Sequence, residues 1–339
     1  MGVNRAALLA CICAVLLAGM TQPARAASPE GARLAVMVDS LRDERGADIV
    51  TMGPGGESPQ AVIRGAGFTR PSWSADGSLL ALGATGDWKG TVIAVAEADG
   101  PRLRFYRRAV LEGSNAVMAP SGRTVAFPRT ELVKVLPGRE NYLYKSSIWL
   151  LDVKSGAVRR KTPWRLQTLL DPSSFTPDGS KLAVTISDRR GLRAVAVDMK
   201  TGRTSPLAQE ASEPMYSPDG SEVAFIRWKT WRASGVNDRL PPINELRVTS
   251  VGDPSKSRLL LRRHSLFAEP SWDPSGDRLA YIDSHVDENG DLTPEEGDKL
   301  MEINADGSCL TRVFSEPGIV VSGPAWQPGL GRGAGPILC

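Results

Sequence analysis

Short apolar runs recur along this chain, and each is bounded by turns that contain glycine and proline. In one unit, residues 71–77 (Pro-Ser-Trp-Ser-Ala-Asp-Gly) lead into an apolar run at 79–82 (Leu-Leu-Ala-Leu). Alanine, aspartate and a glycine that tolerates positive φ suit a tight turn, so this pattern predicts two antiparallel strands. A third apolar run at 91–95 and a second turn at 98–100 (Ala-Asp-Gly) precede a polar segment. The unit therefore predicts a four-stranded antiparallel sheet.

The first turn of this unit is repeated along the chain. Its glycines are Gly77, Gly122, Gly179, Gly220, Gly276 and Gly329, at steps of 45, 57, 41, 56 and 53 residues. Sheets of four short strands cannot bury their own faces, so neighbouring units must stack. The steps match one blade of a β-propeller with loops of variable length. Alternating helical segments are absent from the pattern, which argues against a parallel α/β fold.

The two ends of the repeat region complement each other. Residues 33–38 (Arg-Leu-Ala-Val-Met-Val) match a second strand that lacks its first strand, and residues 323–328 (Gly-Pro-Ala-Trp-Gln-Pro) supply a first strand that lacks its second. Together they make one further blade. We therefore predict an all-β, six-bladed propeller of four-stranded antiparallel blades, closed by pairing of its N- and C-terminal strands, which removes an exposed sheet edge.

These repeats resemble the TolB-like, WD40-like (PD40) propeller repeat. Its consensus runs roughly Pro-x-Trp-Ser-Pro-Asp-Gly, then two residues, Leu-Ala-Phe and a later Ala-Asp-Gly, and the resemblance covers residues 31–329. It implies the fold but not one activity, since similar blades occur in TolB, beside prolyl-peptidase-like hydrolase domains and in some polysaccharide lyases. TolB itself has an additional N-terminal α/β domain, and we expect this chain to be the propeller without it.

The first 26 residues have the pattern of a cleaved secretory signal peptide. Arg5 precedes an apolar run at 6–20, and Ala24 and Ala26 provide small residues before the expected cleavage point. The alternative is an uncleaved anchor helix. We expect residues 27–329 to form the propeller and 330–339 a glycine-rich tail, and we expect the protein to be secreted or periplasmic.

The cysteine count supports an oxidising compartment. Cys11 and Cys13 lie in the predicted signal, which leaves Cys309 and Cys339. Two cysteines in an exported protein predict one disulfide, here tying the tail to the body of the protein. Two free buried thiols are the alternative.

The composition and net charge argue against some classes of binding partner. Hydrophobic residues make up 41% and charged residues 23%, as in a folded globular protein. Once Arg5 and Arg25 are removed with the predicted signal peptide, the chain has 39 basic and 38 acidic residues. This balance gives no bulk electrostatic reason to bind nucleic acid, and we expect no stable membrane insertion after signal cleavage.

The longest connections should gather at one end of the ring. Strand parity places both tight turns of each blade at one end and the long segments 83–90, 129–146, 227–244 and 284–299 at the other. Aromatic and arginine side chains there suit recognition. The candidate ligand-binding residues are Trp88, Lys89, Arg139, Tyr142, Tyr144, Trp228, Trp231 and Arg232. Alternatively, Tyr144 and Trp228 simply cover neighbouring blades; Trp73, Trp272 and Trp326 share one repeat position and are expected in the core between blades.

One acidic segment has the ligand spacing of a calcium loop. Its oxygen-bearing side chains at positions 1, 3, 5, 9 and 12 are Asp287, Asn289, Asp291, Glu295 and Asp298. Position 6, usually glycine, is Leu292. A solvated acidic loop without Ca²⁺ is the alternative, and no other cofactor is expected.

Motifs for catalysis are missing from the sequence. Gly-x-Ser-x-Gly, His-Glu-x-x-His and the Walker A pattern do not occur, and the chain has only two histidines. No catalytic residue is therefore predicted. We expect a monomeric, non-catalytic platform that binds a protein or cell-envelope ligand. The alternative is a hydrolase or polysaccharide lyase that uses carboxylates and arginines at the channel mouth. Converging acids there would favour the enzyme, and an open, aromatic-lined mouth would favour the binder.

Overall fold

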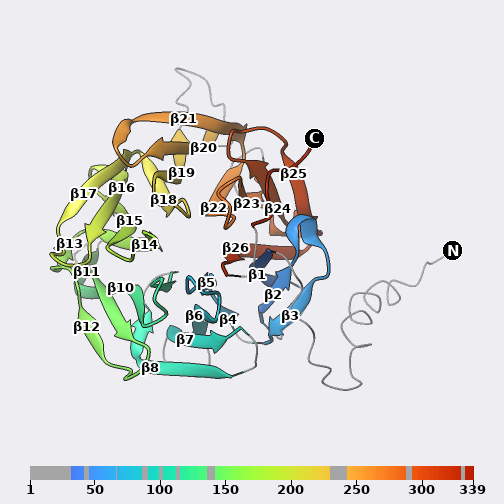
Figure 1. The fold of residues 1–339 in the computed structure, drawn as a ribbon. Coiled ribbons are helices and arrows are strands. Elements are labelled where there is room, and N and C mark those ends of the chain that lie inside the picture. Colours follow the sequence, from blue (N-terminus) through green and yellow to red (C-terminus); the bar gives the residue numbers. More distant parts are fainter. Residues whose placement is uncertain are drawn as a thin grey trace.

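The six predicted blades are arranged around a central axis (Figure 1). The computed structural model describes residues 32–41, 46–65, 67–85, 91–98, 102–111, 115–135, 142–229, 243–287, 292–329 and 333–339. The predicted signal peptide, 1–26, lies outside these ranges. Within them, no helix is long and apolar enough to cross a membrane.

The blades follow one another along the chain, and each runs from an inner strand at the axis to an outer strand. Blade 1 has β4 (Gly67–Phe68), β5 (Ser72–Trp73), β6 (Leu79–Thr85), β7 (Thr91–Glu97) and β8 (Leu103–Leu111). Blade 2 has β9 (Val117–Met118), β10 (Thr124–Val135), β11 (Tyr142–Asp152), β12 (Val158–Arg160) and β13 (Arg165–Leu166). Blade 3 has β14 (Leu169–Phe175), β15 (Lys181–Asp188), β16 (Gly191–Asp198) and β17 (Thr204–Gln209).

The remaining blades include the one shared by both ends of the chain. Blade 4 has β18 (Ala211–Tyr216), β19 (Glu222–Lys229), β20 (Ile243–Ser250) and β21 (Asp253–His264). Blade 5 has β22 (Leu266–Trp272), β23 (Arg278–Ser284), β24 (Asp298–Asn304) and β25 (Thr311–Ser315), with the 3₁₀ turn η2 (Pro294–Glu296) before β24. Blade 6 has β26 (Ile319–Gln327), β1 (Arg33–Ser40), β2 (Asp48–Met52) and β3 (Gln60–Ile63), with η1 (Pro54–Gly56) before β3.

The predicted fold class and ring closure are confirmed. The C-terminal β26 pairs antiparallel with β1, with Leu34 opposite Trp326. Gly77 of blade 1 turns against this seam with φ of +67°, and an added Cβ there would lie 2.1 Å from the Pro328 carbonyl oxygen. Glycine at this position therefore serves both the turn and the close approach of two blades.

The hydrophobic core lies between adjacent blades rather than within one. Ala35 and Ile49 of blade 6, for example, pack with Leu80 and Leu82 of blade 1. The indole N–H groups of Trp73 and Trp272 donate hydrogen bonds of 3.1 Å to main-chain carbonyls of the preceding blade. Trp326 is buried as well. These contacts confirm the inter-blade position predicted for the repeated tryptophans.

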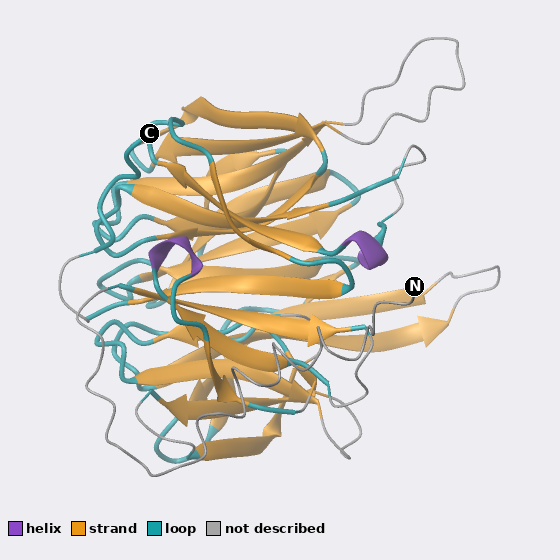
Figure 2. Ribbon diagram, turned by 90° about the vertical axis from the view of Figure 1, so that its right-hand side faces the viewer, coloured by secondary structure: helices purple, strands orange, loops and turns teal. Residues whose placement is uncertain are grey.

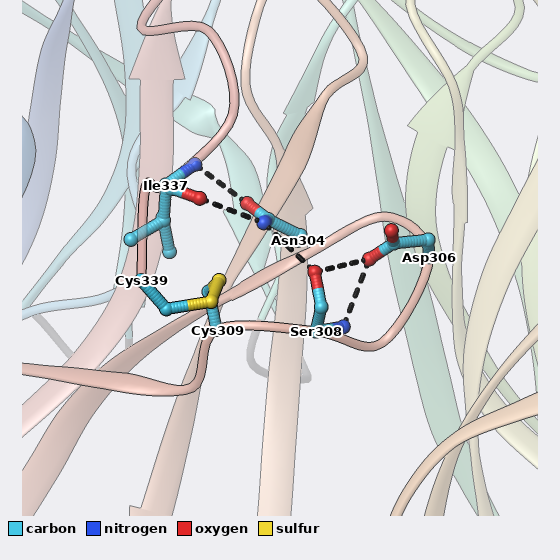
Figure 3. The surroundings of a disulfide bond; sticks show 6 residues. All are labelled: Asn304, Asp306, Ser308, Cys309, Ile337 and Cys339. Atoms are coloured by element: carbon cyan, nitrogen blue, oxygen red, sulfur yellow. Dashed lines mark hydrogen bonds between the residues drawn. A yellow bond between two sulfur atoms is a disulfide. The ribbon is translucent and has the colours of Figure 1, made fainter.

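A disulfide joins Cys309 to Cys339, as predicted (Figure 3). Beside it, the Ile337 amide donates to Asn304 Oδ1 at 2.7 Å, and Asn304 Nδ2 donates to the Ile337 carbonyl at 3.0 Å. Arg278 donates to the Gly335 carbonyl at 2.6 Å. The tail is thus held on blade 5. Because β26 lies between the two cysteines, both of its flanks are attached to that blade.

Loss of the disulfide is expected to lower the free energy of unfolding. The bond closes a segment of 30 residues, for which the chain-entropy model gives about 3–4 kcal/mol. Urea unfolding of the Cys309→Ser, Cys339→Ser double variant measures this difference. An unfolding free energy equal to that of the wild type would contradict a stabilising role.

Candidate functional site in the central channel

The inner strands enclose a cavity of about 350 Å³ on the ring axis. It extends from the prolines of the tight turns, among them Pro177 and Pro218, to Arg70 and Glu269 in the channel. Figure 2 shows the ring from the side, with strands running across its thickness and loops gathered at opposite ends. The cavity walls are largely apolar, whereas its inner end carries charge.

One repeat position brings polar residues into this channel. The position comes three residues before the aromatic or apolar residue of the inner-strand motif, and its occupants are Arg70, Asn115, Pro172, Glu213, Glu269 and Gly323. In blade 3 the polar residue is Asp171, one position earlier. In β18, β22 and β26 it coincides with an irregular pairing register, whereas in β14 the irregularity lies at Ser173 and Asp171 is regularly paired with Thr185. A bulge turns a side chain out of the regular alternation of a strand. The same irregularity in blades 4, 5 and 6 therefore brings Glu213, Glu269 and Gly323 together.

Arg70 joins three blades by pairing with two glutamates. Its Nη2 lies 3.2 Å from Glu213 Oε2, and its Nε donates a short hydrogen bond to Glu269 Oε1. The main-chain amides of Glu269 and Gly323 donate to the carboxylates of Glu213 and Glu269, respectively. Glu213, Glu269 and Gly323 have φ of 54°, 62° and 63°. A left-handed backbone costs free energy at the two glutamates. It occurs where these contacts link blade 4 to blade 5, blade 5 to blade 6, and Arg70 of blade 1 to blades 4 and 5.

The charge states follow from burial and from this pairing. Burial by itself would lower the pKa of Arg70, but Glu213 and Glu269 outweigh it and raise the pKa, so the guanidinium stays charged. Burial raises the pKa of Glu269, and Arg70 opposes that effect. Burial also raises the pKa of Asp171 to about 7; Arg70 opposes the rise, whereas the two glutamates add to it. Asp171 therefore changes charge near neutral pH.

Most of the predicted mouth residues fall outside the described ranges. These are Trp88, Lys89, Arg139, Trp231 and Arg232, and the side chain of Tyr142 is also outside the description. Tyr144 is half-buried in β11 of blade 2. Trp228 is 37% exposed near the end of β19, and its indole N–H donates to Ser212 Oγ of its own blade at 2.9 Å. Ligand binding by these residues stays a prediction.

The segment 129–146, expected as a loop, is mostly strand. β10 continues to Val135 and β11 begins at Tyr142, with Thr130 opposite Ser146 and Leu132 opposite Tyr144. The reason is local, because Thr, Val, Leu and Tyr in this segment favour an extended, paired backbone. The long connection is therefore a hairpin that prolongs blade 2.

Exposed apolar side chains occur at the end of this hairpin and in the neighbouring strands. Leu132 is 59% exposed, Val133 48%, Leu166 62% and Leu169 46%; we call these four residues the hairpin patch. Leu166 lies opposite Lys145 in β11, and Leu169 lies opposite Ser187 in blade 3. The patch thus spans blades 2 and 3 at the end of the ring where we expected ligand recognition.

Basic residues occur in the same strands as the hairpin patch and in the turn after β15. Lys134, Arg189 and Arg190 are exposed, and Arg165 is half-buried. Two acids of the same segments are paired with other bases: Glu131 lies 3.0 Å from Lys145, and Asp188 lies 2.6 Å from Arg193. The described residues around the patch therefore carry an excess of positive charge.

The calcium loop is only partly described. Asp287, Glu295 and Asp298 fall within the described residues, whereas Asn289 and Asp291 do not. Asp298 accepts a hydrogen bond of 3.2 Å from the Val321 amide, and burial raises its pKa. Among the described residues, no group of three or more histidine, cysteine or acidic side chains is arranged to hold a metal. Calcium binding stays a prediction.

Sequence reasoning missed the charged residues of the channel. The signal was the dipeptide that opens several repeats, as in Arg70-Pro71, Glu213-Pro214 and Glu269-Pro270. Each copy alone resembles a solvated turn residue. Their convergence becomes apparent only when the blades are placed around one axis.

Comparisons with known proteins agree with this geometry. A family model described as the lipoprotein LpqB beta-propeller domain matches residues 12–113. The Tol-Pal system protein TolB of Francisella tularensis subsp. tularensis is 22% identical over 264 residues, which cover 76% of this chain and 54% of that protein. The chain thus spans about half the length of the curated relatives it matches.

Solved structures share the fold at low sequence identity. TolB from Acinetobacter baumannii superposes with a TM-score of 0.66 and 19% identity, covering 89% of this chain and 68% of that one. An oligogalacturonate lyase from Vibrio parahaemolyticus superposes with a TM-score of 0.51 and 10% sequence identity, covering 83% of this chain and 79% of that one. The class defined by fold and channel is a closed six-bladed β-propeller. Within that class, the sequence matches confirm the predicted resemblance to TolB-like propellers.

Proposed function

We propose that this protein is a non-catalytic, extracytoplasmic propeller that binds a protein of the cell envelope through the hairpin patch. The observation that carries the proposal is the exposure of Leu132, Val133, Leu166 and Leu169 together at one end of the ring. We take these four side chains to contribute to one apolar binding surface, a feature that is uncommon on folded monomers and often marks an interaction site. Covering one such leucine fully contributes about 1.5–3 kcal/mol.

The charge around the patch indicates the chemistry of the partner. Lys134, Arg189 and Arg190 at its rim would attract an acidic surface and raise the rate of association. The partner is therefore proposed to present an apolar centre within an acidic rim. The TolB relatives are named as Tol-Pal system proteins, which supports a role in an envelope assembly. The sequence pattern of residues 1–26 and the disulfide support an extracytoplasmic site.

Aspartate in the hairpin patch is expected to abolish partner binding without unfolding the propeller. The Leu132→Asp, Leu166→Asp double variant puts charges into the apolar centre, whereas Leu259→Asp alters a leucine that is 41% exposed on the outer strand of blade 4. Affinity capture from the native envelope, followed by mass spectrometry, identifies partners. Titration of the purified partner should then show at least about tenfold weaker binding for the patch variant only. Equal binding by both variants would refute the assignment.

A second candidate function is an enzyme of the channel. It is favoured by the convergence of Asp171, Glu213 and Glu269 around Arg70, an arrangement that acid–base chemistry on an anionic sugar could use. Against it, the two glutamates are already engaged with Arg70 and main-chain amides. Incubation with uronate oligosaccharides distinguishes the candidates, because a lyase would generate an unsaturated, ultraviolet-absorbing product.

A further inference from the structure

Several buried polar atoms at the inner end of the channel lack a partner. Asn115 is 2% exposed and lines the cavity, and neither its Oδ1 nor its Nδ2 has a hydrogen-bond partner among the described residues. The same holds for Ser173 Oγ, which also lines the cavity, and for Asp171 Oδ1. A buried polar group without a partner costs about 1–3 kcal/mol. Asn115 and Ser173 line one cavity and Asp171 lies beside Asn115, so a ligand in the cavity could satisfy these groups.

The electrostatics of this end favour a cation. Asp171 is near Arg70, Glu213 and Glu269, and Asn115 lies beside it without reaching hydrogen-bond geometry. Three acids thus face one guanidinium, so the group carries net negative charge when Asp171 is ionised. An anionic ligand would be repelled, whereas a cation would offset the excess charge.

The walls of the cavity indicate the chemistry of the part of the ligand that lies outside the charged inner end. Trp73, Phe175 and Met215 line it together with the prolines of the tight turns. This apolar lining and the volume of about 350 Å³ suit an alkyl chain of several carbons. The cavity therefore combines an apolar passage with a polar, negatively charged inner end.

We propose that the inner end of the channel binds a primary ammonium group carried on an apolar stem. Three oxygens without partners, those of Asp171, Asn115 and Ser173, match the three N–H donors of an ammonium group. A neutral alcohol offers one donor and no charge. The ammonium belongs either to a free alkylamine or to a lysine side chain of a polypeptide, and the inference does not depend on the hairpin patch.

Calorimetric titration with n-butylammonium chloride tests the site, with n-pentanol as the uncharged analogue of similar length. We expect butylammonium to bind at pH 8 and pentanol to bind at least about tenfold more weakly. Because the pKa of Asp171 is raised to about 7, butylammonium should bind roughly tenfold more weakly at pH 6 than at pH 8. Failure of butylammonium to bind at millimolar concentration, or equal binding of pentanol, would overturn the proposal.

Two variants assign the site to its residues. Asp171→Asn keeps the shape but removes the charge and should weaken butylammonium binding at least about tenfold, whereas Asp277→Asn removes an exposed acid and should leave binding unchanged. Melting temperatures establish that both variants are folded. The comparison of butylammonium with pentanol uses the wild-type protein and so does not require either variant to fold. Unchanged binding by Asp171→Asn would overturn the assignment. A peptide containing lysine, compared with the same peptide carrying acetyl-lysine, separates a polypeptide source from a free amine.

Discussion

Replacing Arg70 with methionine is expected to lower the free energy of unfolding by about 3–5 kcal/mol. The change leaves the carboxylates of Glu213 and Glu269, which are 20% and 15% exposed, without their shared cation. Methionine fills much of the same space, so the loss comes mainly from uncompensated charge. Urea unfolding at pH 8 measures it.

The pH dependence separates this electrostatic effect from a packing defect. Without Arg70, the folded-state pKa of Glu269, which burial already raises, rises further above its unfolded value, so the variant loses stability as the pH increases through that interval. The deficit should therefore be smaller at pH 5 than at pH 8. Arg64→Met changes an exposed arginine and should alter stability by less than about 0.5 kcal/mol. The role assigned to Arg70 would be contradicted if both variants lost the same unfolding free energy, or if the loss in Arg70→Met were larger at pH 5 than at pH 8.

Deleting residues 317–339 is expected to abolish cooperative unfolding. The deletion removes β26, leaves the inner edge of β1 unpaired and exposes the cluster in which Val321 and Trp326 pack with Leu34. An open ring would also present a sheet edge to other chains. Near-ultraviolet circular dichroism during urea titration should show a broad transition in place of a sharp one.

A shorter deletion is the matched control. Removing residues 330–339 leaves Cys309 unpaired in the same way but keeps β26. This variant should lose stability comparable to that of the cysteine double variant and still unfold in one sharp transition. A sharp transition of wild-type slope after deletion of 317–339 would show that strand pairing between the chain ends is dispensable.

The candidate sites were only partly accessible from sequence. The end of the ring with long connections was predicted, and the hairpin patch lies there, but its leucines were not named because exposure depends on how far β10 and β11 extend. Trp228 was predicted as a contact residue, and in the structure its indole N–H is bonded within its own blade. Hydrogen bonds of this kind depend on rotamers, which residue type alone does not specify.

What the sequence determined by itself was the number of blades, the shared closing blade and the Cys309–Cys339 pair. These features rest on local turn chemistry, on alternating apolar positions and on a cysteine count, all of which can be read along the chain. The tertiary structure alone decided the channel chemistry. Arg70 and Glu269 are 199 residues apart, and they meet because irregular inner strands and ring closure bring one repeat position of several blades to a common axis.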